Sequence, residues 1–221
     1  MSACCDHDCD PGPAAFHDDE KARAYRRVLW FALVVNAGMF GVEIAGALIS
    51  GSVALQADAL DFLGDAANYG ISLAVVGMHL AWRARAALLK GLSMGAFGLW
   101  VIGTTLWRIT QGGVPEAHII TSVGLAALLA NVAVAAALYR YRAGDANMRS
   151  VWLCSRNDAI ANVAVIAAGA GVWATGSFWP DVAVGAVIAG LALTASVDVV
   201  RRAIVELRTA KNAGRMAAAA D

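Results

Sequence analysis

Six long apolar segments joined by short connections constrain this chain more than any other feature of its sequence. Each segment has the roughly 20 residues that an α-helix needs to cross the hydrocarbon core of a bilayer. The connections leave little room for a domain outside the membrane. We therefore expect an all-α polytopic membrane protein with six transmembrane helices. The predicted helices cover residues 28–49, 53–81, 87–109, 117–139, 151–175 and 180–200.

The composition supports a membrane protein and argues against a nucleic-acid partner. Of the 221 residues, 59% are apolar and 15% are charged, whereas a soluble domain has about 45–50% apolar and about 25% charged residues. The formal net charge is zero, so the chain lacks the overall basic field that nucleic-acid binding needs. Residues 1–27 are polar and charged, and no secretory signal precedes the first apolar segment.

Basic residues are concentrated at alternate ends of the predicted helices, and Arg108 is the exception. Cytoplasmic loops of membrane proteins carry an excess of Lys and Arg. Both termini are therefore expected in the cytoplasm, and the protein in the inner (plasma) membrane of the cell. The residues that carry this pattern are Lys21, Arg23, Arg26, Arg27, Arg83, Arg85, Lys90, Arg140, Arg142, Arg149, Arg201, Arg202 and Arg208.

The helices divide the chain into three parts. Residues 1–27 form a flexible cytoplasmic tail with a basic anchor, residues 28–204 form the transmembrane domain, and residues 205–221 form a short cytoplasmic tail. The first tail has a Cys/His composition that suits soft or borderline metals, although an acidic disordered tail without a dedicated site is the alternative. Its metal-ligating residue types are Cys4, Cys5, His7, Cys9 and His17.

The second predicted helix contains three carboxylates, Asp58, Asp61 and Asp65. A charged side chain at the centre of a bilayer costs roughly 2.5–3.5 kcal/mol on insertion scales. The sequence around them has no Lys or Arg, so a bound cation is the natural source of positive charge. Residues three, four and seven apart lie on one helix face. We therefore expect the three acids to share one face.

Two pairs of residues with a four-residue spacing can supply a metal site. Asp61 and Asp65 form one pair, and Cys154 and Asp158 form the other in the fifth predicted helix. Four ligands from facing helices suit tetrahedral Zn²⁺, and a thiolate favours Zn²⁺, Cd²⁺ or Co²⁺ over Mg²⁺ or Mn²⁺. At 1.5 Å per residue, Asp65 lies roughly 22 Å and Asp158 roughly 15 Å from the cytoplasmic helix ends, so both are near mid-membrane.

Several of these residues could have a structural role instead of binding a metal. Cys154 could be a small buried apolar residue. Arg156 could pair with Asp158, but we prefer that it extends to the cytoplasmic interface. If Cys154 is not a ligand, Asn157 or Asn162 could contribute instead.

Other polar residues in the apolar segments suggest structural roles. Asn36, Asn131 and Asn162 are expected to hydrogen bond between helices. His79 lies near an interface and is not expected to be a ligand. Asp181 is at a helix start, where the helix dipole favours an acid, so we expect it to act as a cap.

The chain resembles the cation diffusion facilitator family of metal/proton antiporters, over nearly its whole length. The resemblance is carried by Ser52-Val53-Ala54-Leu55-Gln56-Ala57-Asp58-Ala59, by Asp61-x-x-x-Asp65, by the pair on the fifth helix and by Trp179-Pro180-Asp181. It implies that Asp61, Asp65 and Asp158 belong to the transport site. Cys154 stands where the family commonly has His. The resemblance also implies a homodimer, here through transmembrane helices, because the chain looks like a short form without the cytoplasmic C-terminal domain.

The sequence thus suggests efflux of a divalent transition metal, Zn²⁺ as first choice and Cd²⁺ or Co²⁺ as others, by proton antiport. Carboxylates and thiols must lose protons to bind a metal, so metal and protons compete for one site. We expect a transporter without a prosthetic group, not an enzyme, because no nucleophile–base set accompanies the acids. An intramembrane metal-dependent enzyme and a metal-sensing or structural membrane protein are the alternatives.

Overall fold

The described part of the chain is a bundle of long helices. The structure is a computed structural model that describes residues 19–74, 80–142 and 146–217, and these residues contain no strand. The helices are α1 (Asp19–Ser50), α2 (Val53–Ala74), α3 (Leu80–Gln111), α4 (Ala117–Leu138), α5 (Ala146–Thr175) and α6 (Trp179–Ala217), with a short 3₁₀-helix η2 (Tyr139–Tyr141) after α4. The prediction of an all-α protein is confirmed.

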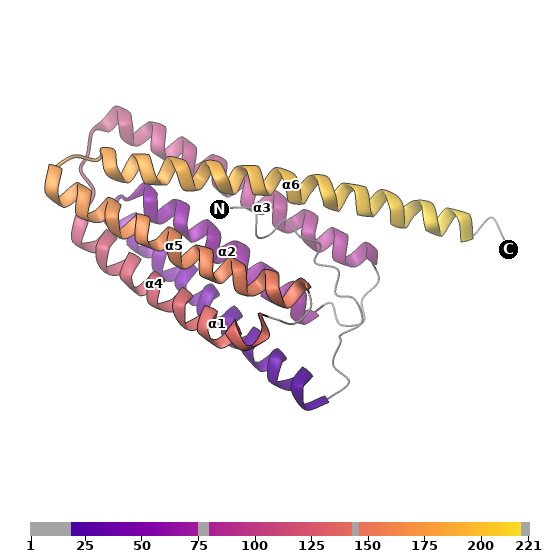
Figure 1. Cartoon of the computed structure of the whole chain (residues 1–221). Coiled ribbons are helices and arrows are strands. Elements are labelled where there is room, and N and C mark those ends of the chain that lie inside the picture. Colours follow the sequence, from indigo (N-terminus) through magenta and orange to yellow (C-terminus); the bar gives the residue numbers. More distant parts are fainter. Residues whose placement is uncertain (1–18, 75–79, 143–145, 218–221) are drawn as a thin grey trace.

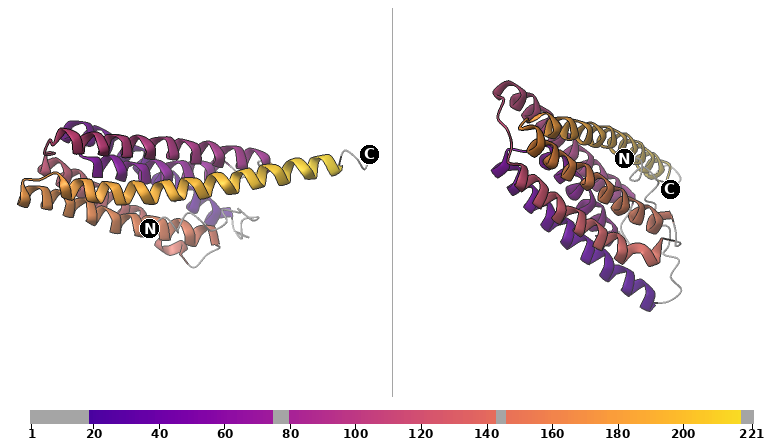
Figure 2. Two further views of the ribbon diagram at one scale, coloured as in Figure 1. Left: turned by 90° about the horizontal axis from the view of Figure 1, so that it is seen from above. Right: turned by 60° about the vertical axis from the view of Figure 1, so that its left-hand side comes forward.

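Helix α2 lies at the centre of the bundle and contacts all five other long helices. The most extensive contacts join α3 to α6 and α4 to α5, followed by the contact between α1 and α2. Figure 1 shows the start of α1 and the end of α6 at the same end of the bundle, and Figure 2 shows that α6 extends beyond the other helices. The acids of α2 therefore lie inside the bundle rather than on its rim.

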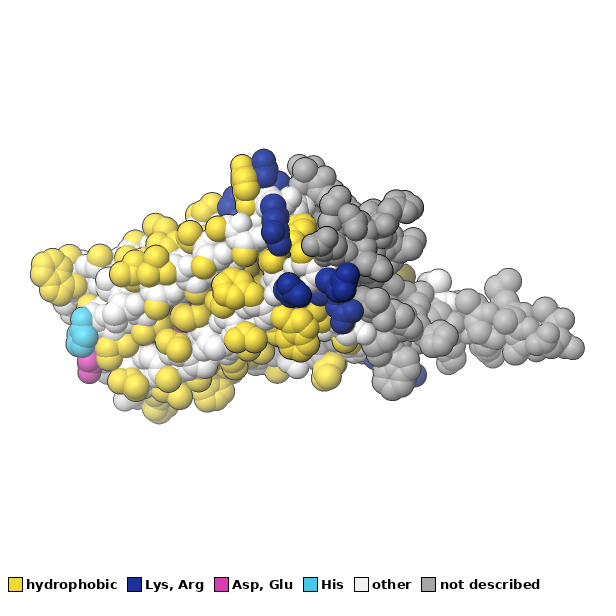
Figure 3. Space-filling view, turned by 90° about the horizontal axis from the view of Figure 1, so that it is seen from below, with side chains coloured by type: hydrophobic (Ala, Val, Ile, Leu, Met, Phe, Trp, Pro, Cys, Tyr) yellow, Lys and Arg dark blue, Asp and Glu magenta, His cyan; other side chains and the backbone are white. Residues whose placement is uncertain are grey.

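The outer surface of the bundle is suited to lipid. Helices α1, α3, α4, α5 and α6 are long and apolar enough to cross a membrane, whereas α2 combines a length of 22 residues with three aspartates. Large apolar side chains such as Leu48, Leu99, Trp107 and Trp173 are exposed on the outside. Hydrophobic side chains cover much of the face that Figure 3 shows, while Lys and Arg gather toward one end of its described part. The chain is a multi-pass membrane protein.

Three helices end in the same way at the end of the bundle opposite this basic region. A glycine follows each helix and adopts a positive φ, which closes the last turn without steric cost. Its backbone N–H donates to the carbonyl oxygen four residues earlier, at 2.8–2.9 Å. These glycines are Gly51 after α1, Gly112 after α3 and Gly176 after α5.

The start of α2 is capped by Asp181, which comes from the first turn of α6. One carboxylate oxygen of Asp181 accepts a hydrogen bond from the backbone N–H of Val53 at 2.8 Å. The other accepts from the Ser52 hydroxyl at 2.5 Å and from the N–H of Ala54 at 3.2 Å. Buried N–H groups at a helix start need such partners. Asp181 therefore caps α2, whereas the sequence led us to expect a cap on its own helix, α6.

Some predicted helix limits are wrong. The connection predicted at residues 82–86 is helical, because α3 begins at Leu80. The predicted extension of the second helix beyond Ala74 falls on residues 75–79, which lie outside the described part. Helix α6 continues from the predicted end at residue 200 to Ala217, because its Ala, Arg, Leu and Glu residues favour a helix outside the membrane as well.

Some predictions fall outside the part that the structure describes. The Cys/His tract of the first tail and His79 lie there. The division of the chain at residues 27 and 204 also stays a prediction.

The close contact between α6 and the first turn of α2 generates a stability prediction. A Cβ atom at Gly185 would lie 2.8 Å from the carbonyl carbon and 2.9 Å from the oxygen of Val53. Because backbone atoms cannot rotate away, we expect Gly185→Ala to destabilise the protein by about 1–3 kcal/mol. Gly190→Ala is the control, since a Cβ there meets no atom within 4 Å. Thermal unfolding in detergent is the measurement, and equal melting temperatures for the two variants would contradict the prediction.

Candidate metal-binding site

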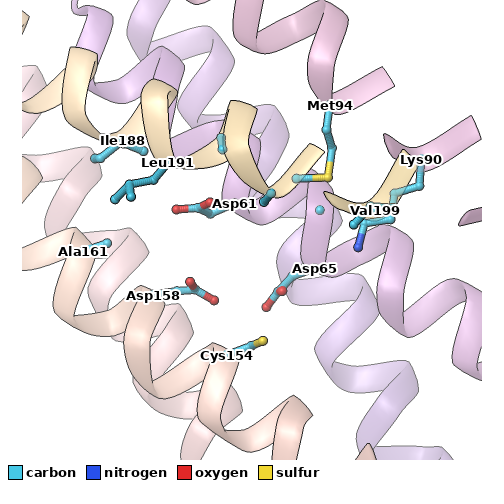
Figure 4. Close-up of a pocket in the computed structure, with 13 residues that line it drawn as sticks. Asp61, Asp65, Lys90, Met94, Cys154, Asp158, Ala161, Ile188, Leu191 and Val199 are labelled. Atoms are coloured by element: carbon cyan, nitrogen blue, oxygen red, sulfur yellow. The ribbon is translucent and has the colours of Figure 1, made fainter. Parts of the chain in front are cut away.

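A cavity of about 60 Å³ lies between α2, α3, α5 and α6. On this measure a water molecule needs about 10–15 Å³, so the cavity has room for an ion with a few waters. Figure 4 shows its polar side chains converging from three helices, with apolar side chains of α6 beside them. Its polar and sulfur-containing residues are Asp61 and Asp65 from α2, Lys90 and Met94 from α3, and Cys154 and Asp158 from α5.

The structure brings the two predicted pairs to one place. Asp65 and Cys154 are buried, with exposed fractions of 5% and 7%, and Asp61 and Asp158 are half-buried. The carboxyl groups of Asp65 and Asp158 lie within hydrogen-bonding reach of each other when one carries a proton. In Figure 4 the Cys154 sulfur faces the same space as the Asp65 carboxylate. The helix spacing of the sequence therefore translates into a shared pocket.

The four side chains are close together without forming a finished coordination sphere. Within the described ranges, no group of three His, Cys, Asp or Glu side chains is compact enough to hold a metal ion as it stands. Zinc ligands lie about 2.0–2.3 Å from the ion. Binding of an ion to all four groups would therefore require side-chain rotation or a small approach of α5 to α2.

Asp65 is oriented by two residues that the sequence analysis did not identify. The Tyr69 hydroxyl, one turn along α2, donates to Asp65 Oδ2 at 3.0 Å. The same hydroxyl lies 2.9 Å from the hydroxyl of Ser155 on α5. Tyr69 and Ser155 are both fully buried, so this chain of hydrogen bonds fixes Asp65 relative to α5. The four-residue spacing of Asp65 and Tyr69 in the sequence places them on one helix face, and it could have indicated this contact.

Lys90 corrects the expectation that no basic residue lies near the acids. It lines the pocket, hydrogen bonds to the side-chain oxygen of Asn68 and acts electrostatically on Asp65. In the sequence, Lys90 belongs to the basic residues expected near the cytoplasmic ends of the predicted helices. Because α3 begins at Leu80, Lys90 lies about 15 Å along this helix. The pocket therefore has a positive charge of its own.

Asp58 lies two turns before Asp65 on the continuous helix α2, so it shares that helix face as expected, but it does not line the pocket. It is 1% exposed, and its Oδ2 accepts a hydrogen bond from Asn162 Nδ2 of α5 at 2.7 Å. Asn162 Oδ1 accepts from Asn131 Nδ2 of α4 at 2.9 Å. The expected interhelical role of these two asparagines is confirmed. Asn36 instead donates to the Ala32 carbonyl oxygen of its own helix at 2.8 Å.

Arg156 and Asn157 face away from the pocket. Arg156 is exposed, donates to the side-chain oxygen of Asn157 at 3.1 Å and lies 5.4 Å from the ring centroid of Trp152. Neither residue is among those that line the cavity. Arg156 is therefore outside the pocket that Asp158 lines, and its extension to the cytoplasmic interface stays a prediction.

An acidic pocket enclosed by membrane-spanning helices defines a membrane protein that handles cations or protons. Residues 29–208 match the family described as the cation efflux transmembrane domain. The chain belongs to this cation efflux family, and it is therefore a transporter of metal cations by family. Comparison with curated proteins gives no match.

Proposed function

We propose that this protein exports a divalent transition-metal ion, Zn²⁺ first, from the cytoplasm in exchange for protons. The observation that carries the proposal is the shared pocket in the middle of the bundle. It is lined by Asp61, Asp65, Cys154 and Asp158, which we assign as the metal ligands. Three carboxylates and a thiol form a mixed oxygen and sulfur site, which favours Zn²⁺, Cd²⁺ or Co²⁺ over hard cations.

Charge balance explains why a metal ion would enter this site. The three carboxylates and the thiolate can supply four negative charges, and Lys90 supplies one positive charge. A divalent ion reduces the remaining negative charge to one, which lowers the cost of holding these groups away from water. Without the ion, protons are the other available source of positive charge.

This exchange is the basis of the proposed antiport. A site open to the cytoplasm binds the metal and loses protons, and a site open to the outside takes up protons and releases the metal. The two states differ in access, so α2 and α5 would change their relative position. We assign the cytoplasm to the basic end of the bundle in Figure 3, in line with the excess of Lys and Arg on that side of membrane proteins. The plasma membrane and a homodimer through transmembrane helices are part of the same proposal.

The ligand assignment predicts loss of transport when either central acid is removed. Asp65→Ala and Asp158→Ala should each lower metal uptake into inverted vesicles at least tenfold, because each removes a charged ligand from the pocket. Glu116→Gln is the control, since the Glu116 side chain is 55% exposed and pairs with His118. Transport by either alanine variant at the rate of the wild type would show that the ligand assignment is wrong.

Cys154 provides a test of metal selectivity. If its thiolate is a ligand, Cys154→His should reduce Cd²⁺ uptake relative to Zn²⁺ uptake, because imidazole is a harder ligand than thiolate. Cys154→Ala should reduce uptake of both ions. Metal-by-metal uptake into inverted vesicles, with wild type beside both variants, is the measurement. An unchanged ratio and unchanged rates would assign Cys154 to packing.

Replacement of Lys90 should strengthen metal binding, in contrast to replacement of a ligand. Replacement by Gln keeps a donor for Asn68 but removes a positive charge from the pocket, so the divalent ion should bind more tightly. Charges that share a partly buried site interact by roughly 1–4 kcal/mol, and water in the pocket reduces this interaction, so we expect roughly tenfold tighter binding. Zn²⁺ titration calorimetry is the measurement, with Arg201→Gln on the exposed part of α6 as control. Weaker binding by Lys90→Gln would contradict the prediction.

A further inference from the structure

Glu43 is a buried acid that the proposed transport site does not use. It lies on α1 with an exposed fraction of 0%, and neither of its carboxylate oxygens has a hydrogen-bond partner. Its carboxyl group faces Asp58 on α2, within hydrogen-bonding reach if one of the two carries a proton. Asp58 Oδ1 also has no partner. Two carboxyl groups therefore face each other with three unpartnered oxygens.

Other helices hold this pair through amide side chains. Asn162 of α5 donates to the second oxygen of Asp58 at 2.7 Å, and Asn131 of α4 donates to Asn162 at 2.9 Å. All four residues are at most 2% exposed. The amides stabilise one negative charge on Asp58, and they leave the oxygens between Asp58 and Glu43 without a donor.

The charged groups around the pair do not supply a counter-ion. Besides Asp58, Asp61 on α2 acts electrostatically on Glu43, and Asp61 is also an acid. Asp181 of α6 is bonded to the start of α2, and Lys90 of α3 acts on Asp65 in the pocket. The described side chains of α4 and α5 that reach the pair are the neutral amides. The environment of the pair is therefore negative.

A single proton would resolve this arrangement. Two ionised carboxylates without a positive partner are strongly destabilised inside a protein, and like charges side by side add repulsion. One proton between Glu43 and Asp58 removes one charge and gives an O–H···O hydrogen bond between the unpartnered oxygens. The remaining charge rests on Asp58, where Asn162 stabilises it.

We propose that Glu43 and Asp58 form a proton-binding site separate from the metal pocket, and that this proton leaves when the metal enters. The proposal rests on the proposed function. Asp58 is one turn before Asp61 on α2, and Asn162 is one turn after Asp158 on α5, so the pair and the pocket share two helices. A divalent ion in the pocket stabilises a second negative charge on the pair, and the proton passes to the solvent. By linkage, protonation of the pair weakens metal binding by the same factor.

The test is the number of protons released per Zn²⁺ ion bound by the purified full-length protein. Titration calorimetry at constant pH in buffers of different ionisation enthalpy measures it. Glu43→Gln should still bind Zn²⁺ but release about one proton fewer than wild type, because a glutamine has no proton to lose and donates its amide to Asp58. Asp58→Asn should show the same deficit, because Glu43 beside an amide stays neutral with or without metal. Glu116→Gln, an exposed acid, should match wild type.

The outcomes separate this proposal from the proposed function. The proton site is supported by two results together. Asp65→Ala abolishes the Zn²⁺ binding seen in the wild type, and Glu43→Gln or Asp58→Asn releases fewer protons per bound Zn²⁺ than the wild type does. If Glu43→Gln does not fold, Asp58→Asn decides. Proton release equal to wild type in a variant that binds Zn²⁺ overturns the proton site alone. Absence of Zn²⁺ binding by the wild type, or binding unchanged in Asp65→Ala, would instead overturn the metal site.

Discussion

Burial of carboxylates in the central helix is the constraint on which the rest of the structure depends. Helix α2 contacts every other long helix, and each of its three acids needs a different compensation for lost water. Asp58 accepts from Asn162 and faces Glu43. Asp65 accepts from Tyr69 and interacts with Lys90. Asp61 lines the cavity, which has room for water or an ion. The other helices are arranged to supply these partners, which explains why the polar residues of α1, α4 and α5 point inward.

The contacts of α2 also suggest which helices move together. Asp181 and Gly185 join the first turns of α6 directly to the backbone of α2, and α6 packs in turn against α3. The contact between α2 and α5 is less extensive than the contacts of α2 with α1, α3 and α6. It includes the hydrogen bonds Tyr69–Ser155 and Asn162–Asp58, and both helices also contribute to the apolar core. A change of access by relative movement of α2 and α5 would therefore disturb the smaller of these contacts, while α2, α3 and α6 keep theirs.

The sequence predicts the helical class and the pairing of the acids on α2 with Cys154 and Asp158 on α5, because apolar length and four-residue spacing are local properties. It does not predict what depends on helix rotation and on how the helices pack. Lys90 lines the pocket because of how α3 packs against α2 and α6. The turn of Asp58 toward Glu43 and Asn162 follows from the way α1 and α5 pack on α2, which the sequence does not contain as a pattern.

The metal pocket and the Glu43–Asp58 pair differ in the space that they offer to a ligand. The metal pocket has a cavity of about 60 Å³, a thiol and several side chains that can rotate, so it can accommodate an ion with part of its water. The Glu43 and Asp58 side chains are buried, neither lines that cavity, and the amides beside them are joined by a hydrogen bond between α4 and α5. Space at that pair suits a proton rather than a hydrated cation. The metal ion and the proton would then bind at different places along α2 and α5. They would not compete directly for the same carboxylate oxygens.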